Sequence, residues 1–155
     1  MNSKWTTAGA VAVALGATVA AYAQDMKPAD IVRARIDRFR EIGTAFKTIN
    51  DELKKPRPLK VMLTSAGSNI ASNAREIQPL FPQGTGPASS LKMKAKMEVW
   101  SQRKAFDSKF ARLIVEADKM NAATRTGDFD AMRAQAKALG AVCQDCHKTF
   151  RTKDD

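Results

Sequence analysis

Three side chains that could bind a cofactor lie within five residues near the end of the chain. Cys143, Cys146 and His147 form the pattern C-x-x-C-H, which is the attachment pattern of c-type haem. On a helix, Cys143 lies three residues from Cys146 and four from His147, so all three project to one side. Two thioethers can then tether a porphyrin edge while the imidazole reaches the iron. The sequence predicts one covalently bound haem c per chain, with His147 as the axial iron ligand.

Three other uses of these residues fit the sequence less well. A structural zinc site needs four ligands, whereas the chain has one His and two Cys in all. A redox dithiol begins a helix near a βαβ unit, but this motif lies late in a helical pattern with no strand pattern in sight. A disulfide closes poorly between cysteines this close inside a regular helix.

The composition restricts both size and chemistry. The 155 residues suit a single domain, and the formal net charge is +10. The single His excludes sites that need two imidazoles, including a bis-His haem. A basic chain with only 6% aromatic residues favours a solvated basic surface over nucleic-acid binding.

The first 23 residues have the pattern of a cleaved export signal. Lys4 supplies the positive charge, residues 8–20 are uncharged, and Ala21-Tyr22-Ala23 places small residues at the two positions that a signal peptidase reads. The apolar stretch is too short and too rich in Ala for a bilayer span of about 20 residues. We expect cleavage after Ala23, export to the periplasm, and a mature domain of residues 24–155 without a membrane span.

After the signal, apolar residues recur in steps of three and four, which is typical of helices. Prolines and the Thr126-Gly127-Asp128 break punctuate the pattern. The predicted helices run over about 28–54, 58–78, 93–123 and 128–152. Long helices with short connections pack most simply as an antiparallel four-helix bundle, so the predicted fold is all-α.

The core is predicted from the same periodicity. The residues expected to face inward are Val32, Phe39, Ile42, Phe46, Ile49 and Leu53; Leu59, Met62, Ala66, Ile70, Asn73 and Ile77; Val99, Trp100, Phe106, Phe110, Leu113, Ala117 and Met120; and Phe129, Met132, Ala136, Leu139, Cys143, Cys146 and Phe150.

One arginine occupies a core-facing position of the first helix. Arg35 falls in line with Val32 and Phe39, and burying a guanidinium without an anion is costly. Haem carries two propionates, and the planar fork of arginine suits a carboxylate. We expect Arg35 to pair with a propionate, which would place Phe39 over the haem plane. The alternative is that Arg35 extends to solvent from the end of the bundle.

The sixth iron position stays open on the residues alone. Because His147 is already the proximal ligand, a strong distal ligand would have to be Met or, less often, Lys. Seven methionines are present, and none of the six beyond the signal stands out: Met26, Met62, Met93, Met97, Met120 and Met132. The alternative is an open distal face packed by an apolar side chain.

Taken together, these features resemble the cytochrome c′ family over essentially the whole mature chain. The resemblance is carried by Arg35 with Phe39, Glu98-Val99-Trp100-Ser101, Gly127-Asp128, the motif of residues 143–147, and Phe150-Arg151. One departure is Met97, near which the family usually has a proline before the Trp.

The resemblance implies a five-coordinate, high-spin haem with His147 proximal, Phe39 at the distal position and Arg151 near the proximal face. Such proteins bind NO and CO, discriminate against O₂ and are often homodimers. A sister group of low-spin electron carriers has a ligating Met at the position of Phe39, so that alternative is not favoured.

These inferences lead to a function with no substrate turnover. We expect a haem protein that transfers electrons with an unidentified periplasmic redox partner, binds NO or CO, or does both. The alternatives are a low-spin electron carrier with a Met ligand and a haem enzyme acting on NO or peroxide. Peroxidase chemistry usually needs a distal acid–base group, and no spare His exists to provide one.

Overall fold

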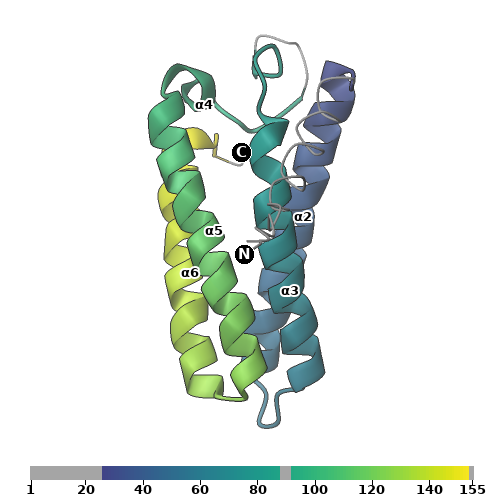
Figure 1. Ribbon diagram of the computed structural model, residues 1–155, viewed down its shortest axis with the longest axis vertical. Helices are drawn as coiled ribbons and strands as arrows, with labels where there is room; N and C mark the ends of the chain where they lie inside the picture. Colours follow the sequence, from purple (N-terminus) through teal and green to yellow (C-terminus); the bar gives the residue numbers. More distant parts are fainter. Residues whose placement is uncertain (1–25, 88–91, 154–155) are drawn as a thin grey trace, which may run out of the picture.

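The computed structural model describes residues 26–87 and 92–153, and it confirms the all-α four-helix bundle (Figure 1). Its long helices are α2 (Pro28–Leu53), α3 (Lys60–Ile77), α5 (Arg103–Thr126) and α6 (Phe129–Phe150). Successive long helices run antiparallel, so the start of α2 and the end of α6 lie at the same end of the bundle. The predicted signal, residues 1–23, lies outside the described residues. Within the described part, no helix is long and apolar enough to cross a membrane.

Local sequence explains where these helices begin and end. Pro28 stands in the first turn of α2, where its missing N–H costs nothing. Gly127 ends α5 in the left-handed conformation, with φ of 88°, which glycine adopts without steric cost. The Asp128 carboxylate then accepts hydrogen bonds from the backbone N–H groups of Asp130 and Ala131 and caps α6.

The third helix starts later than the sequence predicts. It was expected from about Met93, but residues 92–97 are not helical, and a short α4 (Glu98–Ser101) precedes α5. The reason is backbone pairing with the end of α6: Lys96 N–H donates to Phe150 O (2.9 Å) and Thr152 N–H to Lys94 O (2.8 Å). These bonds hold the segment beside the attachment motif.

Most of the predicted core is buried, with one error of helical phase. Leu59 and Met62 are exposed, at 54% and 44%. Leu59 precedes the first residue of α3, and the buried face of α3 runs through Leu63, Ala66 and Ile70 and so excludes Met62. Leu63 is fully buried. The predicted core residues of the third helix, from Val99 to Met120, are all buried.

The four helices do not contact one another equally. The α2–α3, α3–α5 and α5–α6 pairs make extensive contacts, whereas α2 and α6 make far fewer. Between α3 and α4 the chain forms η1 (Gln78–Leu80) and a loop that lies against α2. The bundle is therefore closed on three seams and loose on the fourth.

Candidate functional site

The C-x-x-C-H motif occupies the last turns of α6. Cys143 and Cys146 are half-buried against the core, while His147 is exposed on the same helix. Phe150 fixes the end of α6, because its buried ring meets the Phe106 ring edge-on, with 5.4 Å between the ring centroids. The helix therefore presents two sulfurs and one imidazole on neighbouring turns.

The surroundings keep both cysteines as thiols. Burial raises the pKa of Cys143, and it raises the pKa of Cys146 to about 11. Both cysteines are free rather than joined in a disulfide. Partial desolvation and the positive charge of Arg151 lower the pKa of His147, which favours the neutral imidazole that can coordinate a metal.

Arg35 is enclosed by the loop after α3. Its side chain is 2% exposed. Nη1 donates to Leu80 O (3.1 Å) and Thr85 Oγ1 (3.4 Å), and Nη2 donates to Thr85 O (3.1 Å) and Met93 Sδ (3.5 Å). Desolvation lowers the pKa of Arg35 to about 10. The guanidinium therefore holds the loop to α2 and does not extend to solvent.

Phe39 is linked to the end of α6 through a series of aromatic contacts. Its half-buried ring meets the Phe81 ring edge-on at 6.4 Å, and Phe81 meets Phe106 at 4.8 Å. Phe106 in turn contacts Phe150, three residues after His147. The Arg35 guanidinium lies 4.4 Å from the centre of the Phe81 ring. Thus the structure connects Arg35 and Phe39 with the motif through Phe81.

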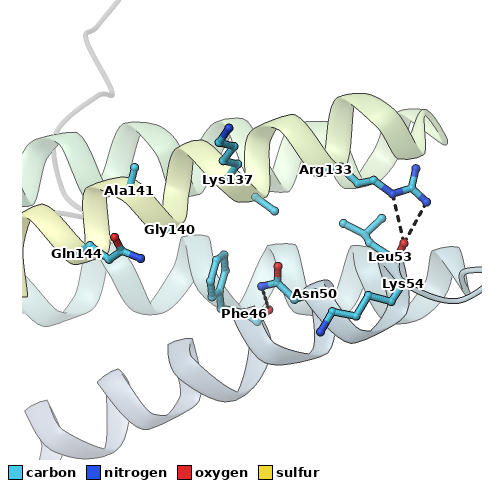
Figure 2. A pocket seen from close by; sticks show the side chains of 10 residues that line it. Phe46, Asn50, Leu53, Lys54, Arg133, Lys137, Gly140, Ala141 and Gln144 are labelled. Atoms are coloured by element: carbon cyan, nitrogen blue, oxygen red, sulfur yellow. Dashed lines mark hydrogen bonds between the residues drawn. The ribbon is translucent and has the colours of Figure 1, made fainter. Parts of the chain in front are cut away.

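A groove of about 600 Å³ runs along the loose α2–α6 seam (Figure 2). On the α6 side it is lined at positions 133, 137, 140 and 144, and the same three-to-four-residue step leads to His147. Gly140 allows a close approach to α2, because a Cβ there would lie 3.3 Å from Phe46 Cζ. To the right of this contact in Figure 2, Nε and Nη2 of Arg133 donate to Leu53 O at 3.2 and 3.0 Å.

These features fit a covalently held haem. Two half-buried thiols can form thioethers, and the neighbouring imidazole can coordinate iron. A Cβ built on Gly43, one turn after Phe39, meets nothing within 4 Å, so space adjoins α2 there. Within the described ranges, no cluster of three or more His, Cys, Asp or Glu could hold a metal ion by itself.

Comparison with known proteins identifies the family. A family model described as "Cytochrome C'" matches residues 30–151, which is most of the chain. The chain belongs to the cytochrome c′ family. Members of this family carry covalently attached haem c, so the cofactor predicted from the motif is confirmed at the level of the family.

Individual relatives agree with this assignment. Cytochrome c′ from Rhodospirillum rubrum is 30% identical over 141 residues, covering 91% of this chain and 95% of the relative. Cytochrome c-556 from Agrobacterium tumefaciens is 30% identical over 123 residues, covering 79% and 97%. The nitric oxide complex of a mutant cytochrome c prime from Alcaligenes xylosoxidans has a TM-score of 0.74 at 25% identity, covering 83% and 98%.

Sequence reasoning missed the residues that hold the site together from the loop. Phe81 and Thr85 lie between the predicted helices and were not singled out, and Phe46 was predicted only as a core residue. Gly140 carried a readable signal, since glycine inside a helix costs about 1 kcal/mol relative to alanine and often marks a close approach. The contacts of Phe81 and Thr85 with Arg35 carried none, because they depend on how a long connection folds back.

Proposed function

We propose that this cytochrome c′ family member is an exported, periplasmic haem protein that transfers electrons, binds NO or CO, or does both. The observation that carries the proposal is the arrangement on α6, where two thiols and the lone imidazole of the chain lie on adjacent turns beside the loosely packed seam with α2. When bound, the haem supplies an iron centre that changes oxidation state and binds diatomic gases.

In this proposal three residues hold the cofactor. Cys143 and Cys146 form the thioethers, and His147 coordinates the iron from the proximal side. Asp128 at the start of α6 and Phe150 at its end fix the helix that carries all three. Arg151 follows Phe150 and adds positive charge near His147.

The distal side in the proposal is apolar and lacks a ligand. Phe39 has no donor atom, so a haem iron bound here would have no protein ligand from Phe39 and would be five-coordinate and high-spin. A phenyl ring offers no hydrogen bond to stabilise a polar Fe–O₂ unit, whereas NO and CO need less help. The Phe81 ring, in contact with Phe39, limits how far Phe39 can move when a gas enters.

Arg35 is proposed as the partner of a propionate. It is a buried cation, and no carboxylate within the described ranges forms an ion pair with it. The loop groups that accept its hydrogen bonds are neutral, so the guanidinium is hydrogen-bonded but its charge is not balanced by an anion. A propionate would supply the missing anion.

A low-spin haem with a methionine ligand is the second candidate. One observation favours it: Met93 Sδ lies 3.5 Å from Arg35 Nη2. Arg35 in turn precedes Phe39 by one helical turn on α2. Met120 and Met132 are fully buried in the core and would have to leave it to reach a cofactor.

No enzymatic turnover is proposed. The single imidazole is used as the proximal ligand, so no histidine is left to act as the distal acid–base group that peroxidase chemistry usually needs. The redox partner is proposed to be another periplasmic protein. A homodimer would cover exposed apolar residues at the start of α3, where Leu59, Val61 and Met62 lie.

The test is mass spectrometry and optical spectroscopy of protein matured in a host that attaches c-type haem. The mass is expected to increase by one haem per chain after loss of residues 1–23. The ferric and ferrous spectra should be high-spin, and CO should bind the ferrous form. Polypeptide without an added tetrapyrrole would refute the proposal, and a low-spin ferrous spectrum that resists CO would favour the methionine ligand.

The Phe39→Met variant tests the distal assignment. A thioether at this position should convert the haem to a six-coordinate, low-spin form, as seen in its absorption spectrum. The matched control is Phe46→Met, two turns further along α2, which should leave the spin state unchanged. A high-spin Phe39→Met protein would contradict the placement of Phe39.

A further inference from the structure

The middle of the attachment motif is tied to the neighbouring helix by charge. Asp145, between the two cysteines, receives Lys109 Nζ at 2.6 Å and Arg112 Nη1 at 3.3 Å on its Oδ2 atom. Both cations lie on α5.

This ionic contact lies where α6 has no large apolar side chain in the core. Val142 and Phe150 are buried on either side of the motif. The inward positions between them are those of Cys143 and Cys146, whose sulfurs are needed for thioethers in the proposed function. Between Val142 and Phe150, packing against the core therefore comes from Cys143 and Cys146, and the contact with Asp145 adds a link to α5 in that interval.

The contact is a partly exposed network of three charges, in which the Arg112 side chain is 61% exposed. Lys109 is 24% exposed and Asp145 42%, and a carboxylate with two cations is a small network, which stabilises more than an isolated pair. Asp145 directly precedes Cys146 in the chain. The pair therefore lies beside the cofactor attachment point.

We propose that Lys109, assisted by Arg112, is a positioning residue that acts through Asp145 to fix the rotation of the attachment turn. With that turn held against α5, the stripe of α6 that lines the α2–α6 groove continues to His147 and presents its imidazole toward the seam. This inference rests on the proposed function, in which His147 coordinates haem iron.

The experiment compares two variants whose charge changes are opposite. Lys109→Met and Asp145→Asn are each made in the haem-loaded protein. The readouts are the Fe–His stretching band of the ferrous form by resonance Raman spectroscopy and amide hydrogen exchange of residues 143–150. If positioning is the role, both variants shift the band in the same direction and speed exchange of these amides by roughly fivefold. Lys109→Arg, which keeps the pair, should resemble the wild type.

The matched control is Asp118→Asn. It removes another carboxylate of α5, which pairs with Arg75 of α3, and it makes the same charge change as Asp145→Asn away from the motif. Its Fe–His band and the exchange of residues 143–150 should match the wild type.

Two results would overturn the inference. Band shifts of opposite sign in the two variants would mean that the charges act only through their electric field. An unchanged band and unchanged exchange, even with a lower melting temperature, would make the pair a structural contact only. If the wild-type chain carried no haem, the proposed function would fail, whereas the exchange measurement on the same chain would still decide whether the pair fixes the turn.

Discussion

The two sides of α6 differ in how they meet their neighbours. Toward α5, the helix buries Met132, Leu139 and Phe150 and adds the Lys109–Asp145 contact. Toward α2, it presents Gly140 and a groove of about 600 Å³, and few residues touch. One helix therefore combines a firmly packed face with a face that leaves space.

This difference separates stability from function within one helix. Close packing on three seams supplies most of the burial that stabilises a bundle. The fourth seam can then stay loose without unfolding the chain, and the groove along it reaches Gln144 within the attachment motif. If so, equivalent substitutions on the two kinds of seam should have unequal effects.

The largest expected effect comes from removing one phenyl ring on each side. Phe110 is buried in the α5 core against Phe106, so Phe110→Ala should lower the free energy of unfolding by about 3–5 kcal/mol. Phe46 is half-buried on the loose seam, so Phe46→Ala should lower the free energy of unfolding by roughly 1–2 kcal/mol. Urea denaturation of the matured proteins measures both. Equal losses would mean that the α2–α6 seam is packed as firmly as the others.

A smaller effect with opposite signs is expected for two glycines. A Cβ at Gly67 would lie 2.6 Å from Thr124 Oγ1 and 3.2 Å from the Asn121 Cα atom. Because the backbone on the closely packed α3–α5 seam cannot easily move away, Gly67→Ala should lower the free energy of unfolding by about 1–3 kcal/mol.

At Gly140 the same change meets only the end of the Phe46 ring, at 3.3 Å, and that ring can turn into the groove. The higher helix propensity of alanine should then outweigh this contact, so Gly140→Ala should raise the free energy of unfolding by roughly 0.5 kcal/mol. Thermal unfolding of the pair provides the measurement. A destabilised Gly140→Ala protein would show that Phe46 is held as tightly as Thr124.

The sequence predicted the elements whose information is local. The spacing of Cys143, Cys146 and His147 predicts the cofactor. Gly127 and Asp128 predict the α5–α6 turn, because glycine adopts the left-handed conformation and aspartate caps a helix start. The core of α5 followed from periodicity, because an unbroken three-to-four rhythm from Phe106 to Met120 leaves one choice of face.

The errors arose where tertiary contacts decide between local options. Leu59 and Met62 fitted the periodicity of the second helix, but packing against the neighbouring helices buries the face that begins with Leu63 instead. The start of the third helix moved because Lys94 and Lys96 pair with the end of α6, a contact between distant segments. The partners of Arg35 in the loop could not be read for the same reason. Buried polar contacts depend on a fold that the sequence does not spell out locally.

The smallest expected effect concerns acid. No carboxylate lines the α2–α6 groove, whereas the packed side uses Glu52, which pairs with Lys55 and accepts a hydrogen bond from Leu59 N–H at 3.1 Å. These contacts hold the pKa of Glu52 below its ordinary value of 4.5. A carboxyl whose pKa is lower in the folded protein than in the unfolded chain stabilises the fold above the unfolded pKa, and this contribution disappears as pH falls through the folded pKa.

Acid should therefore loosen the turn between α2 and α3 before it affects the loose seam. The urea midpoint of the wild type should fall between about pH 5.5 and about pH 3. In Glu52→Gln, which cannot titrate at this position, the midpoint should start lower at the upper pH and fall less steeply. If the urea midpoints of the two proteins fell equally steeply as the pH was lowered, Glu52 would not be a source of the pH dependence. In that case, the contrast between the seams would rest on packing alone.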